Sequence, residues 1–513
     1  MANEQNEIME NKKTNVANAT IILMFGAALA KVLGFARELI VAYQFGASNI
    51  SDAFLLTNSI PNLLFGSIAT VVGISYIPVC QSFRDKNEID GFTSNLLNIT
   101  LLIVIIGCAI VVLFPQFFLR IIAGGLNPEA KQYAVTMLRI VVFSIIPIIV
   151  SNLFQAYSQA NGQFHTTAWF GIITNVVIIG TTIIANDRSF YLLSIGVVLA
   201  NTIGMIMTIA GMRSLKFKYE FVVRFSDSNI KKIVLITIPL LIENLAYSMS
   251  LLVDRSLASY LDSGTISGLS YAGTIGNIAV TMIAGSIITA AYPTMSNLAQ
   301  NDRGSLDEHL LSYSRGIVFL LCPISFFMVF FARDITTIVF NHGAFKETSL
   351  VVVWQSLVCY AVGVVPAGLQ TYFIRCFYAF KNTKTPVFIQ VLALFLNITL
   401  NLLSVKYLKH MGIALSTSVS YLIALIFLAI LLKRKHNVSC VKMIIINAIK
   451  GLICALIAGA SVFFIINYIN ISLVIAKIAL ELCLFSIVYL VLAFVLQKES
   501  FSAILSIVKK KLF

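Results

Sequence analysis

Long apolar stretches alternate with short polar loops along almost the whole chain. Most stretches hold roughly 18 residues or more, the length that an α-helix needs to cross the hydrocarbon core of a bilayer. We count about 14 of them, which predicts an all-α integral membrane protein. The predicted spans are 18–44, 52–81, 93–122, 129–158, 165–185, 190–212, 230–260, 266–299, 308–339, 349–380, 386–407, 410–432, 441–468 and 471–497.

The chain also repeats itself with an offset of about 219 residues. Arg37 and Gly46, for example, recur as Arg255 and Gly264. Each repeat holds an even number of predicted spans, six, so both halves enter the membrane in the same orientation and form a parallel repeat. Two related halves that rock about a site between them expose it to each side in turn, which is typical of a transporter.

The repeat divides the chain into five predicted parts. They are an N-terminal tail at 1–17, a first lobe of six helices at 18–213, a basic linker at 214–229, a second lobe of six helices at 230–433, and a two-helix hairpin with a basic tail at 434–513. Lys and Arg concentrate in the loops on the side of both termini, which predicts cytoplasmic termini. We interpret the linker as a topology anchor and flexible hinge; the alternative is a phosphate site.

Composition excludes several classes of protein. Hydrophobic residues make up 58% of the chain and charged residues 11%, whereas about a quarter of a soluble domain is charged. The net charge of +14 lies in short loops, so we expect contact with anionic lipid and none with nucleic acid.

Neither an enzyme nor a metal site is expected. The eight Cys show no metal-ligand spacing and are interpreted as buried apolar residues. The loops are too short for a soluble catalytic domain, and no GxxxxGK[ST] motif marks a nucleotide site.

Charges within a span are functional candidates, because each costs several kcal/mol unless it faces protein or water. The first span and the start of the second contain Lys31, Arg37, Glu38 and Asp52. Two cations near the midplane suit a diphosphate, which Arg binds bidentately and Lys binds as a point charge. The alternative is a closed network of Arg37, Glu38 and Asp52 that only ties two helices together.

The seventh span carries Glu243, Asp254 and Arg255. Arg255 is either a second-lobe counterpart of Arg37 at the diphosphate or an ion-pair partner of Glu243 or Asp254. In the added hairpin, Glu481 and Lys450 are expected to pair.

A candidate cation site combines Asp254 with polar residues of the eleventh and twelfth spans. Asn397 and Asn401 share one helix face at i, i+4, and Thr417 follows in the next span. Such oxygen ligands hold Na⁺ or relay a proton. The alternative is plain hydrogen bonding between helices.

Several motifs resemble the MurJ (MviN) family of lipid II flippases, in the multidrug/oligosaccharidyl-lipid/polysaccharide exporter superfamily. They are KVLGFARE at 31–38, FGA at 45–47, SDAF at 51–54, IPNLL at 60–64 and LVDRSLAS at 252–259. The resemblance implies a V-shaped pair of lobes with a central cationic cavity, and a groove for the polyprenyl tail by the last two spans.

By motif position, Lys31 and Arg37 take the places of cavity arginines, and Asp52 takes the place of a family aspartate. Two departures stand out. The family usually has Arg and then Glu-Gly where this chain has Phe65-Gly66 and Thr70-Val71, and it has Arg where this chain has Thr274.

The expected function is therefore translocation of an undecaprenyl-diphosphate-linked saccharide, most simply lipid II, from the inner to the outer leaflet by alternating access. The expected drive is membrane potential or a coupled Na⁺ or H⁺, without a cofactor. The alternatives are a flippase for another polyprenyl-linked glycan (exopolysaccharide, capsule or O-antigen type) and a cation-coupled small-molecule exporter. We expect a monomer in the bacterial cytoplasmic membrane, in contact with membrane lipids. The glycan, the coupling ion and the resting conformation stay open.

Overall fold

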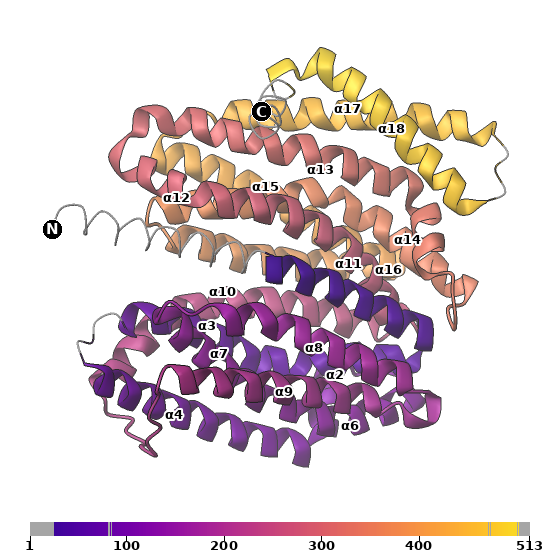
Figure 1. The fold of residues 1–513 in the computed structure, drawn as a ribbon. Coiled ribbons are helices and arrows are strands. Elements are labelled where there is room, and N and C mark those ends of the chain that lie inside the picture. The colour runs from indigo at the N-terminus through magenta and orange to yellow at the C-terminus, as the bar shows by residue number, and fades with distance from the viewer. Residues whose placement is uncertain are drawn as a thin grey trace. The chain divides into compact units, whose positions relative to one another are not determined.

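The computed structural model describes residues 25–80, 83, 85–469, 471, 473–499 and 501. Over these ranges the regular structure is helical throughout, without a strand (Figure 1). A helix satisfies its backbone polar groups internally, which is what a bilayer requires of a spanning segment. The predicted all-α class is confirmed.

The structure also bears on the number of membrane spans. Within the described ranges, ten helices are long and apolar enough to cross a membrane, or up to eleven if the bent pair Glu347–Val362 and Val364–Ala379 forms one span. One helix of 53 residues, Lys384–His436, is broken at Lys409, so it covers two predicted spans. The count of fourteen stays a prediction, since part of the first predicted span lies outside the described residues.

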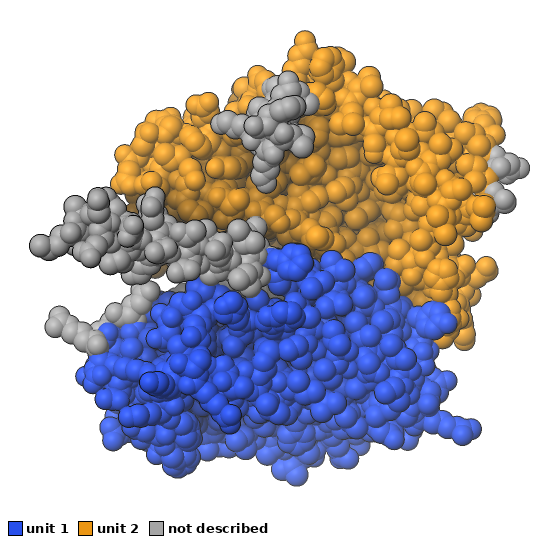
Figure 2. All heavy atoms as spheres, in the orientation of Figure 1, with its two compact units in different colours: residues 1–263 blue, residues 264–513 orange. Residues whose placement is uncertain are grey.

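The chain divides into two compact units, residues 1–263 and 264–513 (Figure 2). Unit 1 contains an unlabelled helix over the described residues 25–45. Its other elements are α2 (Asn49–Pro61), η1 (Asn62–Gly66), α3 (Ser67–Cys80), α4 (Lys86–Leu113), α5 (Pro115–Ile122), α6 (Pro128–Val141), η2 (Val142–Ser144), α7 (Ile145–Ala160), α8 (His165–Ile184), η3 (Asp187–Ser189), α9 (Leu192–Ser214) and α10 (Ser228–Ala258).

The core of unit 1 lies where α3, α4, α7 and α10 meet. Tyr76, Phe92, Tyr157 and Ile233 belong to one buried cluster there. The Tyr76 hydroxyl lies 2.6 Å from the Thr93 hydroxyl, so α3 and α4 share a polar contact inside this apolar cluster. The helices are therefore held in register by specific bonds as well as by packing.

Unit 2 begins at α11. Its elements are α11 (Thr265–Ala279), η4 (Val280–Ala284), α12 (Gly285–Asn301), α13 (Arg303–Phe340), α14 (Glu347–Val362), α15 (Val364–Ala379), α16 (Lys384–His436), α17 (Val441–Asn467) and α18 (Val474–Leu496). An aromatic cluster of Phe327, Phe331 and Phe485 joins α13 to α18.

The division by packing falls later than the predicted end of the first lobe. The helix α10 packs on α3 within unit 1, although the repeat assigns residues 230–260 to the second lobe. Sequence repeats and packing units are different properties of a chain, so the predicted domain boundaries stay a prediction.

The repeat recurs in the local backbone. A π-helical turn interrupts each of two long helices at corresponding places, Asn62–Gly66 and Val280–Ala284. Gly46 and Gly264 both adopt positive φ, 61° and 86°, just before the next helix begins, a conformation in which a side chain is strained. The two repeats therefore share turns and helix irregularities as well as residues.

Candidate functional site

Lys31 lies on the unlabelled helix 25–45 and has an exposed side chain. Within the part of the chain that the structure describes, its ammonium has neither a hydrogen bond nor an ion pair. Leu, Val and Ala surround it in sequence, so a helix with an apolar surface carries one unpartnered cation. Such a charge is costly in a bilayer unless water or an anionic ligand reaches it.

Arg37 and Glu38 form an ion pair on the same helix. Arg37 Nη2 lies 2.9 Å from Glu38 Oε1, with exposed side-chain fractions of 28% and 15%. The other carboxylate oxygen of Glu38, Oε2, is buried without a hydrogen-bond partner. One guanidinium carries five donors, so this single contact leaves Arg37 with capacity for a further anion. The pair is one part of the predicted closed network.

Asp52 lies in the first turn of α2 and is 4% exposed. Ser48 and Ser51 form a capping box at the start of that helix, which positions Asp52 near the helix N-terminus, where a carboxylate is stabilised. Its role as a cavity residue stays a prediction.

Arg255 reaches from α10 to α2. Its Nη1 donates to the backbone carbonyl of Leu55 at 2.8 Å. The neighbouring Asp254 is buried, and the side chain of Glu243 lies outside the described residues. The two predicted roles of Arg255, diphosphate ligand and ion-pair partner, both stay predictions.

The candidate cation residues of unit 2 form an amide ladder inside α16. Asn401 Nδ2 donates to Asn397 Oδ1 at 3.1 Å, and Asn397 Nδ2 donates to Thr417 Oγ1 at 3.2 Å. Both asparagines are buried, at 0% and 2% exposed. The break at Lys409 brings the two parts of α16 together, so these bonds match the interhelical alternative. Asp254 belongs to unit 1, and its part in a cation site stays a prediction.

Sequence reasoning missed the packing of the linker. The Lys218 amide donates to Asp90 Oδ2 at 3.1 Å, and the Arg224 amide donates to Asn95 Oδ1 at 2.7 Å. Asn98 Nδ2 donates to the Val222 carbonyl at 2.9 Å. Residues 215–225 begin and end in turns around an irregular stretch at 217–224, which is bonded along α4. We call this segment the strap. The interpretation of this segment as a topology anchor and flexible hinge did not include these bonds between α4 side chains and its backbone, and it stays a prediction.

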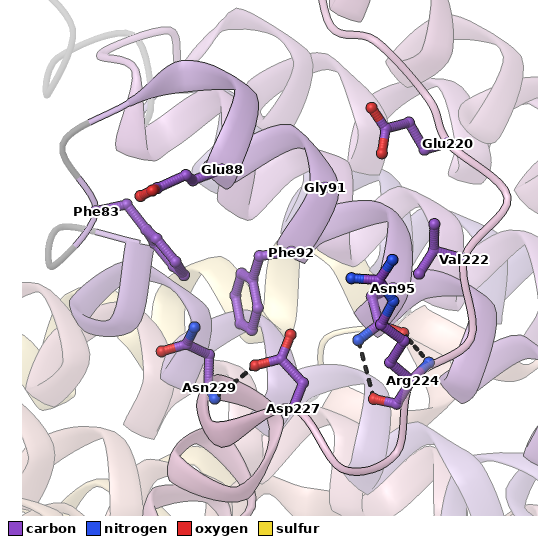
Figure 3. Close-up of a pocket in the computed structure, with 10 residues that line it drawn as sticks. All are labelled: Phe83, Glu88, Gly91, Phe92, Asn95, Glu220, Val222, Arg224, Asp227 and Asn229. Carbon is purple, nitrogen blue, oxygen red and sulfur yellow. Dashed lines mark hydrogen bonds between the residues drawn. The ribbon is translucent and has the colours of Figure 1, made fainter.

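A signal for the strap exists in the sequence. Ser94, Asn95 and Asn98 lie at the start of the predicted span 93–122, and Asp90 precedes it on the same helical stripe as Ser94 and Asn98. Polar side chains there need partners. The turn at the end of the strap encloses a cavity of about 360 Å³ (Figure 3). Phe83, Glu88, Phe92, Asn95, Glu220, Arg224 and Asp227 are among the residues that line it.

The C-terminal hairpin contains a different ion pair from the expected one. Lys477 Nζ lies 2.9 Å from Asp334 Oδ2 of α13 and 3.7 Å from Glu481 Oε1. Glu481 is fully buried. The predicted pairing of Glu481 with Lys450 is wrong, because α17 and α18 run in opposite directions from their connecting loop. Lys450 lies toward the far end of that hairpin from the loop, whereas Glu481 lies near the loop.

Comparison with known proteins adds to this geometry. A family model described as lipid II flippase MurJ matches residues 41–482. A probable lipid II flippase MurJ of Thermotoga maritima is 25% identical over 447 residues, covering 86% of this chain and 90% of the relative. The lipid II flippase MurJ of Burkholderia cenocepacia is 24% identical and covers 79% of this chain and 81% of its own length.

Solved structures support the fold. A lipid II flippase MurJ in an inward closed conformation aligns with a TM-score of 0.82 at 21% identity, over 93% of this chain and 99% of that one. An inward-facing multidrug resistance MATE family transporter aligns at 0.66 and 15% identity, over 83% and 99%. Because the family model extends through most of both compact units, the chain belongs to the MurJ family.

Proposed function

We propose that this chain translocates an undecaprenyl-diphosphate-linked saccharide, most simply lipid II, from the inner to the outer leaflet by alternating access. Membership of a flippase family confirms the prediction of a membrane transporter rather than an enzyme. The relatives named as lipid II flippases support lipid II as the substrate of this chain. Solved neighbours include an inward-facing and an outward-facing MATE family transporter, which supports alternating access.

The environment of the Lys31 side chain is the observation that supports the proposal most directly. Its ammonium is exposed and has no partner among the residues that the structure describes, so it is suited to a diphosphate, which has at least two negative charges to be neutralised. Arg37 supplies further donors beside it in sequence, since its one ion pair with Glu38 uses only part of the guanidinium. In this proposal Arg255 contributes from α10, and its bond to the Leu55 carbonyl holds that side chain in place.

Three residues favour a second candidate, a flippase for another polyprenyl-linked glycan. Phe65 is buried and lies so close to Gly107 that a Cβ there would meet Phe65 Cζ at 2.5 Å. Thr70 and Thr274 each donate to a carbonyl of their own helix, at 3.0 and 2.9 Å. Where the family resemblance implies charges, this chain has an apolar ring and two hydroxyls, so its headgroup contacts differ.

Transport drive and topology complete the proposal. Membrane potential, or a coupled Na⁺ or H⁺, drives the flip. The chain acts as a monomer in the bacterial cytoplasmic membrane with both termini inside, as the distribution of Lys and Arg favours.

The test depletes a cell of its own lipid II flippase, expresses this chain and measures externally accessible lipid II. Rescue by the unchanged chain, and its loss in Lys31→Ala and Arg37→Ala, supports the proposal. Lys131→Ala is the matched control, because Lys131 is also exposed but belongs to the start of α6. Failure of the unchanged chain to rescue, with loss of a surface polysaccharide on deletion, would transfer the function to another glycan.

A further inference from the structure

The strap exposes a row of apolar side chains. Tyr219, Phe221, Val223 and Phe225 are 54%, 84%, 40% and 57% exposed. Tyr219, Phe221 and Val223 alternate along the irregular stretch, and Phe225 lies in the turn that follows it. The Tyr219 hydroxyl donates to Asn98 Oδ1 of α4 at 2.7 Å, so this side chain turns back to α4, whereas Phe221 is the most exposed of the four. Phe221, Val223 and Phe225 indicate a surface that meets another apolar phase, because large exposed apolar side chains gather on one connecting segment.

The intervening residues attach the strap to α4 through their backbone. The Glu220 amide donates to Ser94 Oγ at 3.1 Å. Asn98 binds the Glu220 and Val222 carbonyls at 3.2 and 2.9 Å. Asn95 both donates to and accepts from the backbone of Arg224. Non-helical backbone is tolerated near hydrocarbon only when such groups have partners, and the strap meets this condition.

The strap lies at the level where the surface of α4 becomes apolar. Its bonds extend from Asp90 to Asn98, about 12 Å along the helix at 1.5 Å per residue. Immediately beyond, α4 exposes Leu102, Ile103 and Ile106 at 44%, 51% and 54%, as a lipid-facing helix does. Aromatic side chains concentrate at this boundary between headgroups and hydrocarbon.

Charge around the strap complements an anionic surface. Basic residues outnumber acidic ones between 213 and 232, where the only acids are Glu220 and Asp227. The basic side chains are all exposed: Arg213, Lys216, Lys218, Arg224, Lys231 and Lys232. Basic clusters beside a membrane helix bind anionic lipid headgroups.

We propose that the strap, residues 215–225, is a lipid-binding element. Phe221 and Phe225 insert into the leaflet beside the N-terminal end of α4, while Phe217 packs on Phe154 and Tyr157 inside the fold. The basic residues around the strap bind anionic phospholipid headgroups. The polar face of α4 and the strap then act as one structural unit. Ser94, Asn95 and Asn98 bind the strap backbone, and the outward side chains of the strap contact lipid. The proposal concerns membrane attachment and holds for any transported glycan.

A spin label tests where the outer face of the strap lies. Of the eight Cys, Cys483 is exposed and the other seven are buried, so Cys483→Ser gives a background for labelling Phe221→Cys. The matched control is Glu220→Cys, because Glu220 is among the residues that line the cavity at the strap, whereas Phe221 is the most exposed of the four apolar residues. Collisions with oxygen report contact with lipid, and collisions with a water-soluble nickel chelate report contact with water.

In phosphatidylglycerol/phosphatidylcholine vesicles we expect the label at 221 to be accessible to oxygen and protected from nickel, and the label at 220 to be less accessible to oxygen. Nickel access at 221 equal to that at 220 would overturn insertion of the strap.

A second arm tests the charge. We expect nickel access at 221 to rise several-fold when the vesicles contain only phosphatidylcholine. We expect the same rise in anionic vesicles when Lys216→Gln and Lys218→Gln are combined. Unchanged access in both cases would overturn headgroup binding. The readout involves no transport, so failure here is distinguishable from failure of the proposed flippase activity.

Discussion

Two helices of unit 1, α4 and the helix at 25–45, differ in how far their polar side chains are hydrogen-bonded. On α4, Asp90 accepts from the Tyr157 hydroxyl at 2.6 Å and from the Lys218 amide at 3.1 Å, and Asn95 both donates and accepts. On helix 25–45, Lys31 has no partner in the described structure and Glu38 Oε2 is buried without a donor. Saturated polar groups stabilise a fold, whereas unsaturated ones are suited to a ligand. The difference separates a structural helix from a candidate binding helix.

The largest expected effect is on Lys31. Reversing its charge in Lys31→Glu places a carboxylate where the diphosphate is proposed to bind, so we expect transport to be abolished with unchanged membrane abundance. Lys31→Arg keeps the cation and is expected to retain most activity. The measurement is externally accessible lipid II together with immunodetection of the protein in membranes. Wild-type transport by Lys31→Glu would make Lys31 a structural residue and remove the contrast with α4.

The second prediction tests whether the hydrogen bonds of the polar residues on α4 stabilise the protein. Asp90→Ala leaves the buried Tyr157 hydroxyl and the Lys218 amide without their acceptor, and we expect a loss of about 3 kcal/mol in stability. Tyr157→Phe removes only the hydroxyl and is expected to cost about 1 kcal/mol. Denaturation of the detergent-solubilised protein measures both. Equal stability of Asp90→Ala and the unchanged chain would show that the strap does not depend on this carboxylate.

A third prediction concerns geometry at Arg37. Arg37→Lys keeps the charge but loses the planar fork that binds phosphate bidentately, so we expect transport to fall about tenfold, equivalent to about 1.4 kcal/mol. Stability is expected to change little, because Lys still pairs with Glu38. A large loss of stability without a loss of transport per folded molecule would place Arg37 with the structural residues.

The smallest effect is expected in the amide ladder of α16. Asn397→Ala removes one bond to Thr417 and one to Asn401. Hydrogen bonds in membrane proteins average about 0.6 kcal/mol each, so the two together amount to about 1.2 kcal/mol. We expect that loss in stability and no change in the response of transport to sodium. Disappearance of a sodium response in Asn397→Ala would instead support the predicted cation site, and would give the ladder a role beyond joining two parts of α16.

Local chemistry decided which parts of the molecule were predictable. Apolar runs such as 93–122 predict helices because backbone bonds must be satisfied within the segment in a bilayer, although α4 begins earlier, at Lys86. The recurrence of Gly46 as Gly264 was visible in the sequence, and both residues adopt positive φ in the structure, where glycine is not strained. The strap was not predicted as such, because its bonds join residues about 130 positions apart in the sequence. The partner of Glu481 was also missed, since Asp334 and Lys477 come together only when α13 packs against α18.

The amino-acid sequence by itself determined the helical membrane class, the duplication and the identity of the charged residues, because hydrophobicity, periodicity and charge are local properties of the chain. Tertiary structure alone decided which polar groups have hydrogen-bond partners. Whether Asp90 or Lys31 has a partner depends on which helices and loops pack beside it, and a hydrogen bond requires two groups within about 3 Å in suitable orientation. That condition separates the polar residues that hold this protein together from those left to bind a substrate.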